Sequence, residues 1–503
     1  MNIPSIKLKI LNELIEIPNV LFINNEWVLS NESIEVINPA TEESLGHFHA
    51  ASTGHVDMAV RAARQAFQRG SPWRTISGME RGKMMNRLAD LIEKDREILA
   101  RIETVNTGKP IFESFNFDIV QVVNCIRYFA GFTDKIVGKT LPLSATENLA
   151  NRSLLAYTKQ APLGVVGMIL PWNLPLQLLM WKLAPCLAAG NTVVIKPSEI
   201  TPMTTLYLAK LLVLAGFPPG VVNVINGRGD TVGNAISAHM DIDKVAFTGS
   251  TRVGKMVQIS ATNSNLKHVS LELGGKSPII VFQDSIDKLD SIVMDCYHAL
   301  FWNAGQCCSA ASRIYVQSGI YDSFINKMLE LVKTRKLGDP LSQETNQGPQ
   351  ATKLQFDTVL KYIEIGKAEG AKLEIGGKRH GTVGYYIEPT IFSNVKDEMT
   401  IAREEIFGPV MCILKFDNTD EVIQRANNSE YGLVGSIYTK DINTALLISD
   451  QLEVGLTWIN AFNVIDASVP WGGLGLSGKG RDLSMFCLDG YTETRSFIIN
   501  ASL

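Results

Sequence analysis

The hydrophobic positions of the chain follow helical spacing at first and form short β-branched runs later. Between residues 55 and 105, apolar side chains such as Met84, Leu88 and Leu91 recur three or four positions apart, which predicts amphipathic helices. Later apolar runs rich in β-branched residues predict strands; they lie at 164–170, 192–196, 222–225, 244–248 and 278–282. Helical segments separate most of these runs, so we expect a parallel, doubly wound α/β sheet that binds its ligand at the carboxyl ends of the strands.

A second alternating series begins near Pro278. Helices are predicted around 285–304 and 320–334, and strands at 312–316, 410–415, 433–438 and 456–460. The chain is therefore predicted to contain two α/β domains joined near Gly274-Gly275. Its tail, Tyr491 to Asn500, has the pattern of an edge strand, which tends to pair with another strand.

One uncharged segment, Ala161 to Trp181, is long enough to cross a bilayer. Pro162, Pro171 and Pro175 interrupt it, and a buried strand, a sharp turn and the start of a helix explain this pattern better. We therefore expect no membrane partner.

Composition excludes other classes of protein. The 503 residues are too many for one ordinary core, and the 46% hydrophobic and 19% charged residues indicate a globular chain. The 47 basic and 51 acidic residues nearly balance, so no nucleic-acid partner is expected. Seven scattered cysteines cannot all pair, and the N-terminus fits neither a secretion nor a transit signal; reduced thiols and a cytoplasmic location are predicted.

The candidate chemistry centres on the adjacent Cys307 and Cys308, which follow Gly305-Gln306. Small residues after the pair leave room for a substrate beside a sulfur atom, and a nearby helix start would favour the thiolate. A buried, inert cysteine is the more common alternative. Residue types alone do not decide which thiol reacts, but one of the two must point away from the pocket.

Two further residues suit a reaction on a carbonyl group. Glu272 stands between Leu271 and Leu273 and is predicted to lie on an irregular turn that Gly274-Gly275 permit. Apolar neighbours can raise a carboxyl pKa and make the group a base; a solvated loop carboxylate is the alternative. Asn173 follows a predicted strand, where its amide could donate to an oxyanion; an Asn that caps the next helix is the alternative.

Two strand ends suggest a dinucleotide site. The segment Phe247 to Gly254 opens a helix, and its glycines let a pyrophosphate approach the helix N-terminus; it is not a G-x-G-x-x-G fingerprint, and simple helix capping is the alternative. Lys196 and Glu199 end another strand, where an acidic side chain can accept from both ribose hydroxyls but repels a 2′-phosphate. Solvated loop charges are the alternative there; otherwise NAD is favoured over NADP.

Taken in order, these motifs and two later ones resemble those of the NAD(P)-dependent aldehyde dehydrogenase superfamily, over about Phe22 to Ile499. The matching runs are Pro171-Trp-Asn, Lys196-Pro-Ser-Glu, Phe247-Thr-Gly-Ser-Thr, Glu272-Leu-Gly-Gly-Lys, Gly305-Gln-Cys-Cys, Glu404-Glu-Ile-Phe-Gly-Pro and Pro470-Trp-Gly-Gly. The resemblance implies two doubly wound parallel-sheet domains with a small β oligomerisation arm, a homodimer or homotetramer, and no metal. The implied parts are an NAD-binding domain (1–137 and 159–274), a catalytic domain (275–475) and the arm (138–158 and 484–503).

The resemblance also implies a role for each matching residue. Cys308 would be the nucleophile, Glu272 the general base, and Asn173 with the Cys308 amide the oxyanion site. Lys182 and Asp482 would form a proton exit, with Asp482 one methylene shorter than the Glu more usual in the family. The implied cofactor-binding residues are Ile169, Pro171, Trp172, Lys196, Ser198, Glu199, Gly229, Phe247, Thr248, Gly249, Ser250, Thr251, Val253, Gly254, Leu273, Glu405 and Phe407.

The implied reaction oxidises an aldehyde to a carboxylic acid. The thiolate adds to the carbonyl carbon, hydride passes to the nicotinamide, and Glu272 deprotonates the water that hydrolyses the resulting thioester. Glu272 argues against the branch of the family that passes the acyl group to coenzyme A.

Several segments look like those of phenylacetaldehyde dehydrogenases, namely Arg127–Thr140, Val464–Ala467, Gly480–Leu483 and Leu488–Thr494. The candidate pocket residues are Phe129, Leu174, Leu178, Trp181, Trp302, Cys307, Ile465 and Trp471. Together they suit an apolar or aromatic aldehyde; for some of the aromatic residues, a place in the core is the alternative. Pro470-Trp471 is more typical of betaine and aminoaldehyde dehydrogenases, where Trp can face a cationic amine. An aminoaldehyde is therefore the second candidate substrate.

A catalytically retired fold, used for binding or structure, is the alternative from another class. It predicts the loss of a chemical residue, whereas Cys308, Glu272 and Asn173 are all present. A redox-sensing role for the Cys307–Cys308 pair is compatible with catalysis.

Overall fold

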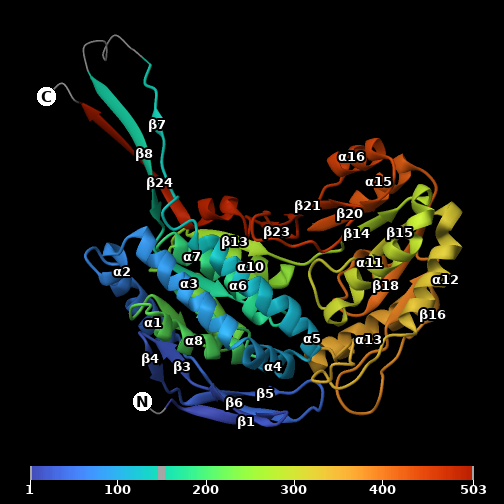
Figure 1. Cartoon of the computed structure of the whole chain (residues 1–503), viewed down its shortest axis with the longest axis horizontal. Helices are drawn as coiled ribbons and strands as arrows, with labels where there is room; N and C mark the ends of the chain where they lie inside the picture. Colours follow the sequence, from blue (N-terminus) through green and yellow to red (C-terminus); the bar gives the residue numbers. More distant parts are fainter. Residues whose placement is uncertain (1–2, 145–152, 501–503) are drawn as a thin grey trace.

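Two large sheets, each covered by helices, form the framework of the molecule (Figure 1). The computed structural model describes residues 3–144 and 153–500. The first sheet has eight strands in the order β23-β13-β12-β9-β10-β11-β3-β4, and the second has seven in the order β16-β17-β18-β15-β14-β20-β21. This architecture confirms the predicted α/β class.

The first sheet is parallel in its centre. The parallel strands are β9 (Val165–Ile169), β10 (Thr192–Lys196), β11 (Val222–Val224), β12 (Lys244–Thr248) and β13 (His268–Glu272). The sequence predicted all but β13. Strands β10 and β12 lie on either side of β9, so the winding reverses between β9 and β12, and a reversal of this kind is where open α/β sheets bind ligands.

Helices and edge strands complete this lobe. The helices between its strands are α7 (Pro175–Ala188), α8 (Met203–Ala215), α9 (Asn234–Ala238) and α10 (Thr251–Ser264), and the antiparallel edge strands are β3 (Leu21–Ile23), β4 (Glu26–Val28) and β23 (Gly478–Lys479). The edges therefore make the sheet mixed rather than wholly parallel.

The second sheet confirms the second predicted series. Its strands are β14 (Pro278–Val281), β15 (Arg313–Gln317), β16 (Lys372–Ile375), β17 (Thr390–Ser393), β18 (Val410–Phe416), β20 (Val434–Tyr438) and β21 (Leu456–Ile459). Only the β16–β17 pair is antiparallel in this sheet. The covering helices are α11 (Leu289–Phe301), α12 (Tyr321–Val332), α13 (Lys353–Ala368), α14 (Thr400–Arg403), α15 (Thr419–Asn427) and α16 (Ile442–Gln451).

The N-terminal part adds strands that the hydrophobic pattern did not predict, helices that it predicted between residues 55 and 105, and further helices that follow this range. The strands are β1 (Ser5–Ile10), β2 (Glu13–Pro18), β5 (Glu32–Ile37) and β6 (Ser44–Ala50). The helices are α1 (Thr53–Phe67), α2 (Pro72–Thr75), α3 (Gly78–Lys94), α4 (Arg96–Thr107), α5 (Ile111–Glu113), the π-helix η1 (Ser114–Asp118) and α6 (Ile119–Ala130).

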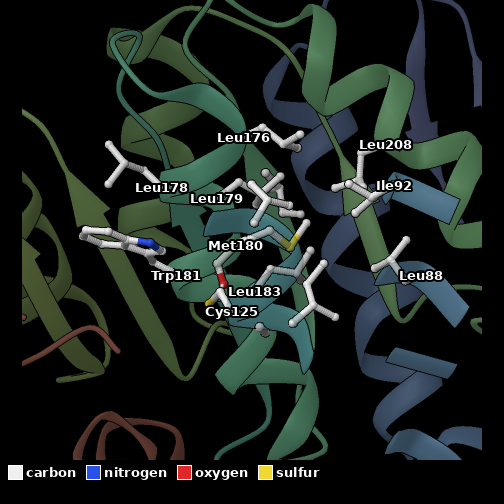
Figure 2. Packing of buried hydrophobic residues seen from close by; sticks show 14 of the residues in the cluster. Leu88, Ile92, Cys125, Leu176, Leu178, Leu179, Met180, Trp181, Leu183 and Leu208 are labelled. Carbon is white, nitrogen blue, oxygen red and sulfur yellow. Dashed lines mark hydrogen bonds between the residues drawn. The ribbon is translucent and has the colours of Figure 1, made fainter. Parts of the chain in front are cut away.

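Helix α7 is buried along its whole length. It packs against α3, α6 and α8, and Figure 2 shows Leu179 and Leu183 facing Leu88 of α3 while Trp181 lies on the other side of the helix. Burial on all sides explains why the segment 161–181 carries no charge: it forms the end of β8, all of β9 and the first half of α7. Within residues 3–144 and 153–500, no helix is both long and apolar enough to cross a membrane.

A three-stranded antiparallel sheet projects from the body (Figure 1). It consists of β7 (Thr140–Leu141), β8 (Leu154–Pro162) and β24 (Thr492–Asn500). The rings of Tyr157 and Phe497 stack across the β8–β24 pair with centroids 5.1 Å apart. The predicted strand at the tail is confirmed, while residues 145–152 and 501–503 of the predicted arm lie outside the described part of the chain.

Candidate active site

A cavity of about 230 Å³ opens where β9 and β12 end, between the two lobes. Its wall consists of Pro171, Trp172, Asn173, Leu178, Thr248, Gly249, Ser250, Leu273, Gly274, Cys308, Gln355, Thr358, Tyr362, Glu405, Ile406 and Phe407. Most of these residues belong to the motifs found in the sequence. The fold therefore brings the predicted thiol, the predicted oxyanion donor and part of the predicted nucleotide-binding set to one place.

The glycine turn after β12 forms one wall of this cavity. Ser250 caps α10, and its hydroxyl accepts from the Val253 amide at 3.4 Å. The residue therefore both caps the helix, as the alternative proposed, and lines the cavity. A Cβ on Gly254 would come within 2.6 Å of the Leu273 side chain, so a larger residue there would have to displace Leu273. The buried Thr248 hydroxyl has no hydrogen-bond partner. A free hydroxyl and the amides of a helix N-terminus fit the phosphates of a dinucleotide.

Lys196 and Glu199 form an ion pair where β10 ends. The Lys196 Nζ and Glu199 Oε2 atoms are 2.8 Å apart, with the lysine buried and the glutamate partly exposed. Burial raises the pKa of Glu199, but the Lys196 charge and hydrogen bonds outweigh it and leave the pKa lowered. Lys196 is thus not a solvated loop charge, and Glu199 stays ionised, as a ribose-binding carboxylate requires. Nearby, Ile169 and Ser198 are buried, and Gly229 is exposed at the start of a π-helix.

The opposite wall comes from the second lobe. Glu405 accepts a hydrogen bond from the Gly275 amide at 2.9 Å. The ring of Phe407 meets that of Trp172 edge-on, with centroids 5.3 Å apart. Phe407 has a left-handed backbone (φ 58°), a strain that is often found at ligand sites. Glu405 and Phe407 thus form a part of the cavity wall that the second lobe contributes.

The two adjacent thiols have different surroundings. Cys308 lies in the cavity wall, whereas Cys307 packs against the core of the second lobe, its Sγ 3.2 Å from the Ser309 hydroxyl. Of the two thiols, only Cys308 thus lies in the wall of the 230 Å³ cavity, and the place of Cys307 in a substrate pocket stays a prediction.

The expected helix start beside Cys308 is wrong. A short 3₁₀ turn, Trp302–Gly305, precedes the pair, and the chain then runs through a loop directly into β15. The hydrogen bond to Cys307, burial, and the negative charges of Glu405 and Glu272 all raise the pKa of Cys308. A raised pKa favours the protonated thiol, so attack by this sulfur would require the loss of its proton.

Asn173 is held beside the thiol by the loop that carries it. Its Nδ2 donates to the Gln306 carbonyl at 2.9 Å, and its own carbonyl accepts from Asn303 Nδ2 at 3.2 Å. Leu174, not Asn173, occupies the N-cap position of α7, so the capping alternative is wrong. An amide nitrogen carries two N–H groups, which leaves one for a substrate oxygen.

Glu272 is the last residue of β13 and is 6% exposed, so neither the predicted turn nor the solvated alternative is correct. Its Oε2 has no hydrogen-bond partner. Burial and the charge of Asp482 raise its pKa well above the usual range, opposed by Lys182 and Arg481. Behind it, Lys182 and Asp482 form a buried ion pair with Nζ and Oδ2 2.6 Å apart. Glu272 is not itself in the wall of the 230 Å³ cavity, although the adjacent Leu273 and Gly274 are.

A larger cavity of about 690 Å³ contains two predicted substrate residues, Trp302 and Ile465. Trp181 and Trp471 are nearly buried and meet edge-on with ring centroids 5.3 Å apart, and Leu174 is likewise buried. The prediction for Phe129 is corrected: it has 0% exposure and belongs to the core around α6 and α7, which is the alternative of a core aromatic.

Sequence patterns missed several cavity residues. In the larger cavity these include Glu113, Phe117, Gln121, Gln177 and Asn463, and in the smaller one Gln355, Thr358 and Tyr362. Phe117 comes from a π-helix, Asn463 from a loop and the others from helices, so no contiguous motif marks them. The one signal was a charge: Glu113 stands between the aromatic residues Phe112 and Phe115. In the described residues, no group of three or more His, Cys, Asp or Glu is arranged to hold a metal ion.

Comparison with known proteins gives the same family over nearly the whole chain. The model of the aldehyde dehydrogenase family matches residues 27–497. Aldehyde dehydrogenase 1A1 of Rattus norvegicus is 50% identical over 484 residues, 96% of this chain and 95% of the relative. The solved NAD⁺ complex of an aldehyde dehydrogenase from Bacillus cereus is 44% identical with a TM-score of 0.93, covering 99% of this chain and 100% of that one.

An indole-3-acetaldehyde dehydrogenase, AldA of P. syringae, solved with NAD⁺ and IAA, is 39% identical with a TM-score of 0.93 and covers 97% of both chains. A match of this extent, together with the cavity that joins the thiol to the nucleotide motifs, shows that the chain belongs to the aldehyde dehydrogenase family.

Proposed function

We propose that this protein oxidises an aldehyde to a carboxylic acid with NAD⁺, and that Cys308 is the nucleophile. The observation that carries the proposal is the position of Cys308 and Asn173 in the wall of the cavity that also contains the glycine turn, Glu405 and Phe407. The relatives solved as NAD⁺ complexes support the cofactor.

Each residue has a step that its surroundings suit. The Cys308 thiol gives its proton to a water molecule, the sulfur bonds to the aldehyde carbon, and the π electron pair of the carbonyl moves to its oxygen. The free N–H of Asn173 stabilises this oxyanion, a contribution of about 3 kcal/mol in comparable sites. Bound NAD⁺ supplies the hydride acceptor. Glu272 then takes a proton from the water that attacks the thioester. We infer that the buried Lys182–Asp482 pair, whose charges act on Glu272, passes that proton on.

We propose NAD⁺ rather than NADP⁺ as the preferred cofactor. The support is Glu199, a partly exposed carboxylate with a lowered pKa where β10 ends. An ionised side chain at this position repels a 2′-phosphate. We expect the ratio of kcat/KM for the two cofactors to favour NAD⁺.

We propose an apolar or aromatic aldehyde, such as phenylacetaldehyde, as the substrate. The 690 Å³ cavity combines the rings of Phe117 and Trp302 with the branched side chain of Ile465, and apolar pockets with a few polar groups are typical small-molecule sites. The related AldA protein is named for another arylacetaldehyde. Glu113 in the same cavity favours an aminoaldehyde as the second candidate, and kcat/KM for phenylacetaldehyde against aminobutanal separates the two.

We further propose a cytoplasmic homodimer or homotetramer. All seven cysteines are described, and none forms a disulfide, which suits a reducing compartment. The projecting arm exposes Leu155, Ile498 and Ile499, and apolar side chains on an edge strand suit contact with another subunit.

The test of the nucleophile compares two neighbouring substitutions. Cys308→Ala should abolish aldehyde oxidation, leave NAD⁺ binding measured by calorimetry intact, and give no acyl adduct in mass spectrometry after quenched turnover. The matched control, Cys307→Ala, should keep most of the activity. An adduct on Cys307, or turnover by the Cys308→Ala variant, contradicts the proposal.

A further inference from the structure

The turn before the two thiols has an unusual backbone. Asn303 (φ 48°), Ala304 (φ 51°) and Gly305 (φ 74°) are three consecutive residues in the left-handed region. For residues with a side chain, this conformation costs about 1–2 kcal/mol each. Such a turn persists only where its surroundings hold it in place.

Side chains from several elements hold this turn. The Asn303 amide donates to Glu113 Oε2 at 3.0 Å, and Gln350 Nε2 donates to the Ala304 carbonyl at 3.2 Å. The Asn303 side chain donates at 3.2 Å to the carbonyls of both Asn173 and Gln306. Of these partners, Glu113 is the one that can carry a charge, and a charged acceptor makes the stronger hydrogen bond.

The same turn reaches both parts of the proposed chemistry. The Asn173 side chain is bonded to Gln306, the residue after the turn, and Cys308 follows two positions later. A shift of the turn therefore moves the oxyanion donor and the thiol together, and a misplacement of about 1 Å can cost on the order of a hundredfold in rate.

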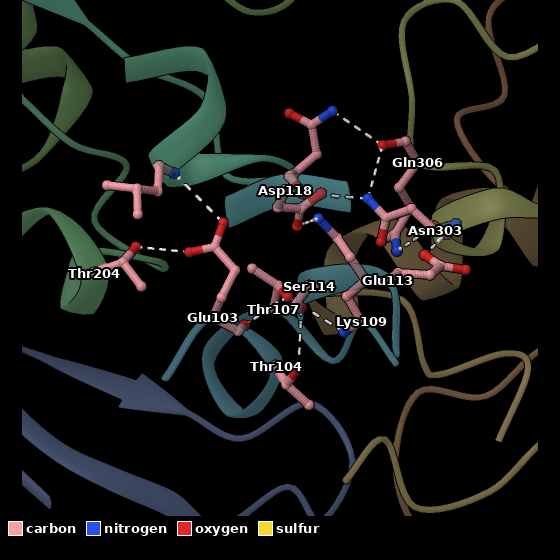
Figure 3. Close-up of polar contacts among 12 residues, drawn as sticks. Glu103, Thr104, Thr107, Lys109, Glu113, Ser114, Asp118, Thr204, Asn303 and Gln306 are labelled. Atoms are coloured by element: carbon pink, nitrogen blue, oxygen red, sulfur yellow. Dashed lines mark hydrogen bonds and ion pairs between the residues drawn. The ribbon is translucent and has the colours of Figure 1, made fainter. Parts of the chain in front are cut away.

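We propose that Glu113 is a positioning residue, whose carboxylate holds the Asn303–Gly305 turn and thereby sets the places of the Cys308 thiol and the Asn173 amide. The catalytic purpose of this placement rests on the proposed function; the placement itself does not. Figure 3 shows Glu113 next to Asn303, with Lys109 and Asp118 beside them.

Several charged groups surround Glu113. Lys109 is paired with Asp118, and Arg335 donates to Tyr297, to Gln347 and to the Phe301 carbonyl. His298 lines the same cavity as Glu113. Lys109 and Arg335 thus have other close partners, and their positive charges stabilise the Glu113 carboxylate only through space.

The strength of the hydrogen bond between the Asn303 amide and Glu113 depends on pH. Burial raises the pKa of Glu113 to about 7, with Arg335 and Lys109 opposing the shift and Asp118 adding to it. Below pH 7 the group is a neutral and weaker acceptor; above pH 7 it is a carboxylate and holds the Asn303 amide more strongly. The turn should therefore be held most firmly on the alkaline side of neutrality.

The test follows the Cys308 sulfur directly in the full-length protein. Alkylation by iodoacetamide, without aldehyde or cofactor, is followed by mass spectrometry at Cys308 relative to Cys307, and kcat and KM are measured in parallel. Glu113→Gln keeps the shape and a neutral acceptor, so we expect kcat to fall about fivefold to tenfold at pH 8 and at most about twofold at pH 6. KM should stay nearly constant, and the ratio of Cys308 to Cys307 alkylation should lose its dependence on pH around 7.

The matched control is Glu103→Gln. The pKa of Glu103 is also raised to about 7 by burial, but this carboxyl accepts from Leu176 and Thr204 rather than from the turn. We expect the control to keep the pH dependence of the wild-type alkylation ratio. Glu113→Asp keeps the charge and should restore part of the loss at pH 8; it also serves as the test if Glu113→Gln does not fold.

Two results would overturn the proposal. One is an unchanged kcat and alkylation ratio at both pH values in Glu113→Gln. The other is a rise in KM with kcat unchanged, which would make Glu113 a substrate contact instead. Because alkylation is measured without turnover, this outcome is independent of whether Cys308 proves to be the nucleophile.

Discussion

Asp482 shows how a single charge sets the chemistry of a neighbour. Its carboxylate is paired with Lys182 and raises the pKa of Glu272, second only to the effect of burial. Replacement by Asn removes this negative charge and leaves the Lys182 cation unpaired, and both changes lower the pKa of Glu272. The base form of Glu272 then exists at lower pH.

We therefore expect Asp482→Asn to move the rising limb of the pH profile of thioester hydrolysis toward lower pH. The measurement is deacylation of Cys308 after single-turnover acylation with p-nitrophenyl acetate. The unpaired buried Lys182 should also reduce the free energy of unfolding by about 3–5 kcal/mol. Asp450→Asn, at an exposed position on α16, should change neither quantity; a profile that moves to higher pH refutes this account of Glu272.

Among single residues, those proposed to react were easier to predict from the sequence than the residues around them. Cys308, Asn173 and the glycine turn were identified because each belongs to a contiguous motif, and the fold brings them to one cavity. Phe117 and Gln121 were missed because they face the larger cavity from a π-helix and the helix after it. Phe129 was misplaced because an aromatic side chain alone does not tell a core position from a pocket position.

Among the elements, the turn that leads to the thiols depends on glycine at one position. Gly305 has φ 74°, and a Cβ there would collide with the Gly408 carbonyl. Gly370 has a similar backbone (φ 90°) with nothing within 4 Å. The two glycines therefore separate the cost of the backbone conformation from the cost of the collision.

We expect Gly370→Ala to cost about 1 kcal/mol of unfolding free energy and to leave kcat unchanged. Gly305→Ala should cost clearly more and lower kcat, because the turn has to move away from Gly408. Chemical denaturation and steady-state kinetics of both variants check this. Equal losses of stability would mean that the collision relaxes without cost.

Elements were predictable where burial gives a simple pattern. Strands β9, β10 and β12 are buried along their length and read as continuous apolar runs, as central parallel strands do. Strand β13 begins with the exposed His268 and carries Ser270, so it lacks such a run. The N-terminal strands alternate with charged residues, and the 3₁₀ turn depends on tertiary contacts that no local pattern records.

For the whole molecule, the arm is the feature that the body does not explain. Strand β24 pairs only with β8 among the described residues, and the side chains of Ile498 (67% exposed) and Ile499 lie on it. If the arm contacts another subunit, Ile498→Glu places a charge in that contact and should shift the mass measured by light scattering toward the monomer. Leu214→Glu, equally exposed on α8 (67%), is the control; no shift in either variant would remove the arm from the interface.

The path of the last part of the chain has a consequence for biosynthesis. After completing the second lobe, the chain returns to the first, where β23 joins β13, Asp482 reaches Lys182, and β24 joins β8. A ribosome therefore releases the strands that finish the first lobe only after it has made the whole second lobe. A polypeptide that a premature stop codon ends before β23 would lack Asp482, the partner of Lys182. It would also expose the edge of β8 that β24 covers, and chaperones and proteases recognise such exposed edges.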